Sequence, residues 1–158
     1  MISVTATRFE DWDTLERQAR ALLAGQRHRV ANAANLSSLI YTTVPDLNWA
    51  GFYFVEAGEL VVGPFQGRPA CVRIAEGDGV CGTAMRTRQT QRVADVHAFD
   101  GHIACDPLSR SEIVVPLIAG DEVIGVLDID SPMPDRFSAA DQRGFEALAK
   151  IYIESLGG

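Results

Sequence analysis

The sequence lacks an excess of positive charge and a long hydrophobic run. Its 158 residues carry 14 Lys and Arg against 21 Asp and Glu, which gives a formal net charge of -7. An acidic chain without a basic stripe repels a phosphate backbone and an anionic lipid surface, so binding to nucleic acid or to a membrane surface is disfavoured. No apolar run reaches the ~18 residues that a membrane span needs, and the first residues do not read as a secretory signal. We therefore expect a cytoplasmic protein.

Common phosphate-binding and metal-binding motifs are missing too. No P-loop or G-x-G-x-x-G pattern occurs, and the glycine-rich segment 76–79 is too short and too acidic to hold a phosphate. His97, His102 and Cys105, with one further cysteine, are weighed as zinc ligands, but their spacing matches no close-pair signature such as C-x-x-C. We therefore expect no metal and no other cofactor.

What is present is typical of a folded α+β protein. Hydrophobic residues make up 47% of the chain and charged residues 22%, and the length suits a single domain, 1–158, with a buried core. Apolar residues at helical spacing predict helices within 1–45 and a last helix over 138–156, where Ser138 and Asp141 resemble a capping box. Short strands, one short helix and a long irregular segment are predicted within 47–136. Strands joined by hairpins favour an antiparallel sheet with helices packed on it.

Two aspartates in the best predicted hairpin could form a site. Asp128 and Asp130 are two residues apart, so their side chains share one face of a strand. Either the strand ends there and both are solvated, or they form a cluster that binds an ammonium group and keeps one carboxyl protonated. Glu112 joins them only if the register allows it. A two-residue loop would place Glu112 opposite Ile129, on the wrong face, whereas one extra residue in the loop or a bulge places it opposite Asp128 or Asp130, and this we predict.

Aromatic side chains mark another strand. Trp49 and Tyr53 are four residues apart, so they share a face, and Gly51 lies between them. One interpretation is a sheet face covered by helices. The other is an aromatic wall around an apolar methyl group, with Gly51 leaving space for it.

The three cysteines have different settings. Cys71 lies in an apolar, strand-like segment, which suits a small buried hydrophobe. Cys81 lies near the start of a helix, where the helix dipole favours a thiolate. Cys105 lies in the irregular segment 94–110, and a long loop of this kind is often functional. Two cysteines that meet in the fold could cycle between dithiol and disulfide through a sulfenic acid.

Six segments between residues 47 and 148 resemble the free methionine-(R)-sulfoxide reductases, enzymes made of a single GAF domain. They are 48–53 (NWAGFY), 63–67 (GPFQG), 79–84 (GVCGTA), 97–106 (HAFDGHIACD), 111–117 (SEIVVPL) and 125–131 (GVLDIDS). The cysteines and the HAFDGHIACD segment are the specific part of this likeness, because a generic GAF domain shares only the glycines and the hairpin. The resemblance implies a GAF fold, with a central antiparallel sheet of about six strands and helices on both faces.

The resemblance also implies a reaction and its residues. Free methionine (R)-sulfoxide would be reduced through a cysteine sulfenic acid and an intramolecular disulfide, and thioredoxin would restore the thiols. Cys105 matches the attacking cysteine, Cys71 the main resolving cysteine and Cys81 a second one. The substrate-binding residues would be Glu112, Asp128 and Asp130, which also assist the sulfoxide oxygen, and Trp49 with Tyr53 nearby. Backbone amides of 101–104 are expected to bind the substrate carboxylate. A homodimer is possible, and the alternative function is a non-enzymatic GAF domain that senses a small ligand or redox state.

Overall fold

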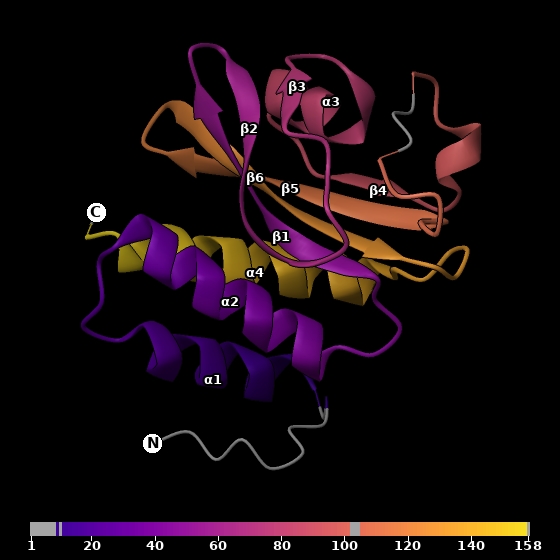
Figure 1. Ribbon diagram of the computed structural model, residues 1–158. Coiled ribbons are helices and arrows are strands. Elements are labelled where there is room, and N and C mark those ends of the chain that lie inside the picture. Colours follow the sequence, from indigo (N-terminus) through magenta and orange to yellow (C-terminus); the bar gives the residue numbers. More distant parts are fainter. Residues whose placement is uncertain (1–8, 10, 102–104, 158) are drawn as a thin grey trace.

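A six-stranded antiparallel sheet forms the centre of the molecule (Figure 1). The computed structural model describes residues 9, 11–101 and 105–157. The strands are β1 (Trp49–Glu56), β2 (Glu59–Gly67), β3 (Arg73–Ala75), β4 (Gln91–Val93), β5 (Ser111–Ala119) and β6 (Glu122–Ser131). They are arranged in the order β3-β2-β1-β6-β5-β4, so the sheet is built from two hairpins that meet at β1 and β6.

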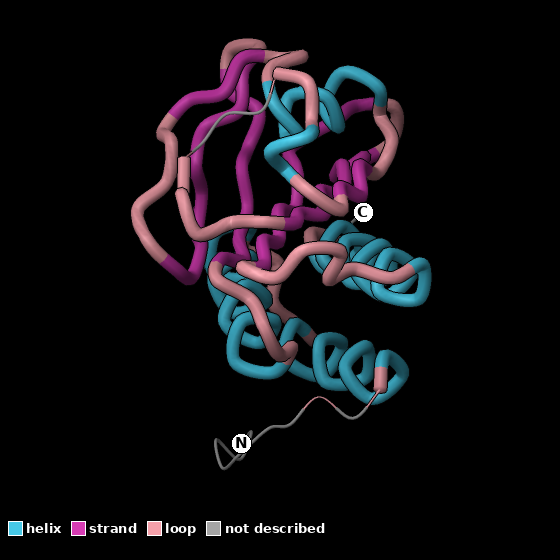
Figure 2. Tube along the Cα trace, turned by 90° about the vertical axis from the view of Figure 1, so that its right-hand side faces the viewer, coloured by secondary structure: helices cyan, strands magenta, loops and turns pink. Residues whose placement is uncertain are grey.

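Helices cover both faces of the sheet, as expected. The helices are α1 (Trp12–Leu23), α2 (Arg29–Thr43), α3 (Gly79–Thr87) and α4 (Ala139–Ser155). Figure 2 shows α1, α2 and α4 together on one side, whereas α3 lies on the opposite side with the loops. Over the described residues, no helix is long and apolar enough to span a membrane.

Alternation along the strands divides the core in two. On β1, Phe52 and Phe54 point to the three helices, where they pack with Leu36, Phe145 and other fully buried side chains. Burial of one such side chain contributes roughly 1.5–3 kcal/mol, so this face supplies most of the stability. The opposite face carries a smaller hydrophobic cluster that includes Trp49 and Tyr53 and packs against residues of α3.

Local sequence signals explain the helix ends. The predicted capping box at the start of α4 is present, since Ser138 and Asp141 each accept a hydrogen bond from the other's backbone N–H. At the end of α1 the chain passes through Gly25, whose φ of 74° lies in the left-handed region that glycine tolerates.

The predicted extra residue in the β5–β6 hairpin is present as a bulge. The turn itself has two residues, Gly120 and Asp121, but the pairing shifts between Leu117 and Ile118. Glu112 therefore lies opposite Asp130 rather than Ile129. This one residue puts all three carboxyl groups on the same face of the sheet.

One predicted strand is wrong in its position. The strand-like segment that was expected to contain Cys71 starts later than that, because β3 begins at Arg73 and Cys71 lies in the loop before it. β3 is a short edge strand that pairs only with β2, so few contacts fix its start. Cys71 is half-buried rather than part of the core, and it is free to make a bond outside the sheet.

Candidate active site

Three carboxyl groups lie together on the α3 side of the sheet. Asp128 and Asp130 project from β6 and Glu112 from β5, and we call them the acid trio. Their exposed fractions are 5%, 8% and 7%. The interpretation that the two aspartates are solvated at a strand end is therefore wrong, because both are buried in a cluster with Glu112. That this cluster binds an ammonium group stays a prediction. Charged groups are this deeply buried only when they have a partner or a task.

Burial controls the protonation of the acid trio. It raises the pKa of each carboxyl, and the neighbouring carboxyl groups add to the effect. For Asp128 the result is a pKa of about 8. Its Oδ1 atom is buried and has no hydrogen-bond partner among the described residues. The trio therefore holds protons near neutral pH and offers an unused acceptor to a ligand.

Cys81 lies in the first turn of α3, directly over the acid trio. It is buried, and its Sγ donates a hydrogen bond of 4.0 Å to Oε2 of Glu112. Burial raises the pKa of this thiol well above its usual value, and the charges of Asp128 and Glu112 raise it further. The expectation that the helix start favours a thiolate is therefore wrong, because desolvation and nearby carboxylates outweigh the dipole.

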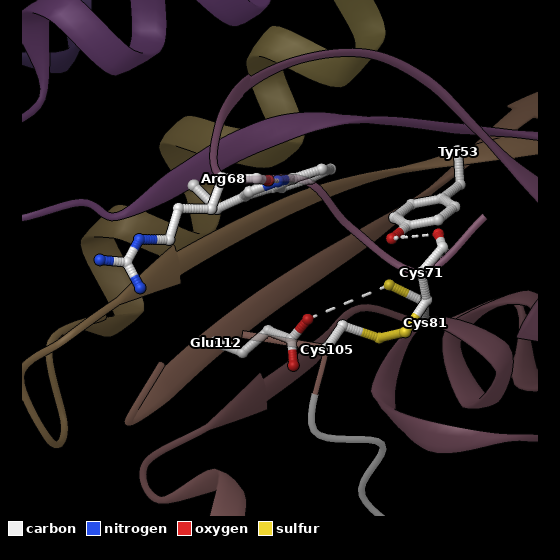
Figure 3. The surroundings of a disulfide bond; sticks show 7 residues. Tyr53, Arg68, Cys71, Cys81, Cys105 and Glu112 are labelled. Atoms are coloured by element: carbon white, nitrogen blue, oxygen red, sulfur yellow. Dashed lines mark hydrogen bonds between the residues drawn. A yellow bond between two sulfur atoms is a disulfide. The ribbon is translucent and has the colours of Figure 1, made fainter. Parts of the chain in front are cut away.

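The other two cysteines form a disulfide. Cys71 and Cys105 are bonded, with their Cα atoms 5.5 Å apart and a sequence separation of 34. Figure 3 shows Cys81 and Glu112 next to this disulfide, with Tyr53 above it. Both bonded residues are half-buried, so the disulfide lies at the boundary between the site and the solvent.

The structure does not assemble the zinc set that was weighed from the sequence. Cys71 and Cys105 are bonded to each other and offer no thiolate, and His102 lies outside the described residues. A different group, formed by Cys81, Glu112 and Asp128, brings its ligand atoms within 4.8 Å of one another. Metal ligands must be deprotonated, whereas the surroundings of these three groups favour their protonated forms. The donor set suits proton transfer better than metal binding.

An aromatic wall forms the next side of the site. The rings of Trp49 and Tyr53 are stacked with their centroids 5.8 Å apart, and Phe65 of β2 stacks on the other side of Trp49 at 5.0 Å. One of the two interpretations had Gly51 leaving space for a ligand, and this part of it is wrong. A Cβ atom there would lie 2.2 Å from the Cβ of Phe65, so the space is taken by that residue. Phe65 was missed because its place depends on the β1–β2 register.

The two aromatic residues also hold the chain around Cys71. Trp49 donates a hydrogen bond through Nε1 to the carbonyl of Arg68 at 3.1 Å. The Tyr53 hydroxyl donates to the carbonyl of Cys71 at 3.3 Å. Burial raises the pKa of Tyr53, so its hydroxyl stays protonated and remains a donor. The wall therefore positions one half of the disulfide.

These groups enclose a small cavity, which we call the site cavity. Its volume is about 50 Å³. The side chains that line it include Trp49, Tyr53, Cys81, Cys105 and the acid trio. It therefore combines a hydrophobic wall, proton-holding acids and a sulfur of the disulfide. The expected carboxylate-binding amides of 101–104 fall almost wholly outside the described residues.

The segment after Cys105 is anchored by a residue that the sequence analysis did not single out. Nδ2 of Asn48 donates to Oδ2 of Asp106 and to the hydroxyl of Ser109, each at 3.0 Å. The only signal in the sequence was the position of Asn48 just before an aromatic strand.

Comparison with known proteins agrees with the fold. A GAF domain family model matches residues 20–152, which with the sheet and helices described above defines a GAF-domain protein. The chain is 53% identical over 141 residues to free methionine-R-sulfoxide reductase of Escherichia coli, covering 89% of this chain and 86% of that protein. By these similarities the chain belongs to the free methionine-R-sulfoxide reductase family.

Two solved structures extend the likeness to the whole chain. The fRMsr of Staphylococcus aureus in complex with substrate is 47% identical, with a TM-score of 0.90, and the match covers 99% of this chain and 100% of that one. The free methionine-R-sulfoxide reductase of Neisseria meningitidis in complex with its substrate is 40% identical, with a TM-score of 0.91, over 96% and 95% of the two chains.

Proposed function

We propose that this protein reduces free methionine (R)-sulfoxide to methionine, with Cys105 as the nucleophile. The observation that carries the proposal is the position of the Cys71–Cys105 disulfide beside three buried acids and an aromatic wall. The relatives named as reductases and the two substrate complexes support the same reaction. We place the protein in the cytoplasm, as one GAF domain that spans the chain and needs no resident cofactor.

The chemistry of the cavity matches a free amino acid that carries a sulfoxide. Ionised members of the acid trio would attract the substrate ammonium, and a peptide bond would remove that positive charge. A protonated member, held so by its raised pKa, would donate to the sulfoxide oxygen and make the sulfur a better electrophile. Trp49 would pack against the methyl group.

The redox steps balance without a cofactor. The Cys105 thiolate attacks the sulfoxide sulfur while a protonated member of the acid trio gives its proton to the sulfoxide oxygen. The substrate S–O bond breaks, the hydroxyl group passes to the Cys105 sulfur, and methionine is released. Cys105 is left as a sulfenic acid. The Cys71 thiol then attacks the sulfenic sulfur, which releases water and forms the disulfide. Thioredoxin would reduce that disulfide to two thiols and become oxidised itself. The half-buried disulfide is next to Val72, which is 60% exposed and offers an apolar contact to such a protein.

A coupled assay tests the proposal. NADPH consumption is followed with thioredoxin, thioredoxin reductase and the separated R and S epimers of free methionine sulfoxide. We expect turnover with the R epimer only, and its loss in Cys105→Ser. Turnover by Cys105→Ser at the wild-type rate would remove Cys105 as the nucleophile. Binding of either epimer without turnover would favour the alternative, a non-enzymatic GAF sensor. Light scattering in the same buffer would show whether the protein is the homodimer that its family suggests.

A further inference from the structure

The side chain of Asn48 fastens the segment after Cys105 to the sheet. Asn48 directly precedes β1, and its backbone N–H donates to the carbonyl of Asp130 at 3.0 Å. Its side chain Nδ2 uses both hydrogens, one toward Asp106 and one toward Ser109, each at 3.0 Å. Asn48 therefore connects β6, which carries two acids of the trio, with the loop that carries the nucleophile.

The loop is shaped to meet this amide. Oδ1 of Asp106 accepts from the backbone N–H of Leu108 at 2.9 Å, and the Asp106 carbonyl accepts from the N–H of Ser109 at 3.2 Å. These bonds close a tight turn over 106–109 and leave Oδ2 of Asp106 and the buried Ser109 hydroxyl for Asn48. The turn and the asparagine thus form one unit directly after Cys105.

The orientation of the Asn48 amide leaves one of its polar atoms without a hydrogen bond. Oδ2 of Asp106 accepts from the NH₂ of Asn48, so the amide oxygen of Asn48 faces the other way. Its Oδ1 is then buried, with no hydrogen-bond partner in the described part of the chain. A buried unpaired carbonyl is unfavourable, which indicates that the contact with Asp106 has a use beyond filling space.

We propose that Asn48 is a positioning residue for the Cys105 nucleophile. It holds the 106–109 turn against the sheet, so that Cys105 faces the acid trio, and it keeps the Asp106 carboxylate engaged and directed away from the sulfur. The effect on turnover rests on the proposed function. That Asn48 fixes the position of the 106–109 turn does not rest on the proposed function, because it concerns only contacts within this chain.

Exchanging the amide and the carboxyl group between positions 48 and 106 tests the contact between Asn48 and Asp106. Asn48→Asp places two carboxylates against each other, so we expect kcat to fall roughly 10- to 100-fold while KM changes less than about threefold, as a displaced catalytic group would give. The double variant Asn48→Asp with Asp106→Asn restores a carboxylate–amide pair with its polarity reversed. It should regain activity to within about fivefold of the wild type. Failure of the double variant to recover while it remains folded would overturn the proposal.

Asn32 offers a matched control. It is buried at 1% exposure in the helical layer, and its Nδ2 also donates two hydrogen bonds, to the Gln26 carbonyl and the Ser155 hydroxyl. Asn32→Ala should lower the melting temperature and leave kcat within about twofold of the wild type well below that temperature. Equal losses of kcat in Asn32→Ala and Asn48→Ala would show that Asn48 acts only through stability, which would also overturn the proposal.

A second readout needs no substrate. In fully reduced protein, the alkylation rate of Cys105 is followed against pH by mass spectrometry of its peptide. The titratable groups near it are Cys71, whose thiol is freed by reduction, and those that line the cavity: Tyr53, Asp78, Cys81, Asp106 and the acid trio. Freed from Asn48, the Asp106 carboxylate can turn toward the sulfur, so Asn48→Ala should shift the midpoint to higher pH, and added Asp106→Asn should shift it back. If the pH midpoint of Cys105 alkylation in Asn48→Ala equals that of the wild type, the positioning role of Asn48 is overturned. This holds even if the wild type proves inactive on methionine sulfoxide.

Discussion

At the scale of single residues, the burial that raises the pKa of Asp128 also lowers the free energy of unfolding at higher pH. Folding raises the pKa of its carboxyl from 3.8 to about 8, because the group is buried beside Asp130. The folded protein therefore keeps a proton that the unfolded chain releases, and the free energy of unfolding falls as pH rises between these two values. We expect Asp128→Asn to be more stable than the wild type at about pH 8, by roughly 1–3 kcal/mol, and to lose at least about 100-fold in kcat.

Denaturant unfolding at several pH values checks this prediction. The loss of stability between about pH 5 and about pH 8 should be smaller in Asp128→Asn than in the wild type. Glu112 and Asp130 should preserve part of the slope, because their pKa values are raised too. Asp121→Asn, in the exposed turn of the same hairpin, is the control and should follow the wild type. A variant less stable than the wild type at both pH limits would contradict the argument.

The two candidate resolving cysteines differ in their bonding and in the pKa of the thiol. Cys71 is already bonded to Cys105, whereas the Cys81 thiol has a raised pKa and is a poor nucleophile. In Cys71→Ser we expect a single turnover to survive, a sulfenic acid to persist on Cys105 and the steady-state rate to fall at least roughly tenfold. Cys81→Ser should have the smaller effect. Rapid-quench counting of methionine and dimedone labelling measure both. Full steady-state activity in Cys71→Ser would identify Cys81 as the resolver.

At the scale of elements, the features predicted from the sequence are those set by side-chain alternation within one hairpin. The features that were missed are contacts between segments far apart in the sequence. Side-chain alternation on one hairpin was enough to place Asp128 and Asp130 together, and the extra residue added Glu112. Phe65 was not recognised because its contact with Trp49 follows from the β1–β2 register. Asn48 was not recognised because its partners are 58 and 61 residues away in sequence.

The close packing of α3 at Gly82 against the backbone of residues 75–77 is another element-scale feature that can be tested. A Cβ atom on Gly82 would lie 2.5 Å from the carbonyl of Ala75 and 3.0 Å from the backbone N of Gly77. Gly82→Ala should therefore lift α3, displace Cys81 from the acid trio and destabilise the protein by about 1–3 kcal/mol, as overpacking does. Because the displaced helix carries part of the site, kcat should fall even under conditions where the variant is fully folded.

Gly144 in α4 provides the comparison for Gly82. A Cβ atom there would lie 2.1 Å from the Trp12 ring, in the contact between α1 and α4. Gly144→Ala should destabilise by a similar amount and leave kcat of the folded protein near the wild-type value. Thermal unfolding followed by assays well below both melting temperatures separates the two effects. Equal kcat values for the two variants would mean that the close packing of α3 at Gly82 does not matter for the chemistry.

At the scale of the whole molecule, the sheet separates stability from chemistry. The face toward α1, α2 and α4 is apolar and closely packed, and the face toward α3 holds buried acids, a buried thiol and the disulfide. The α+β class and the helices on both faces were predictable from periodicity and family likeness. The Cys71–Cys105 pair was expected only from that likeness, because it joins two loops whose approach no local pattern in the sequence encodes. This bond is also the feature that makes the stability of the whole molecule depend on its redox state.

The disulfide crosses 34 residues of sequence, and a cross-link of that length removes conformational entropy from the unfolded chain worth about 3–4 kcal/mol in the chain-entropy model. The oxidised protein should therefore melt higher than the reduced protein, by roughly 5–15 °C for a chain of this size. Calorimetry with and without reductant measures the difference, and Cys71→Ser, which cannot form the bond, should show none. The helices on the far face should keep their hydrogen-exchange protection in both states, because the cross-link joins loops on the α3 side. Equal melting temperatures for the two redox states would mean that the linked segment is already ordered in the reduced and unfolded chain, so that oxidation closes the site without stiffening the molecule around it.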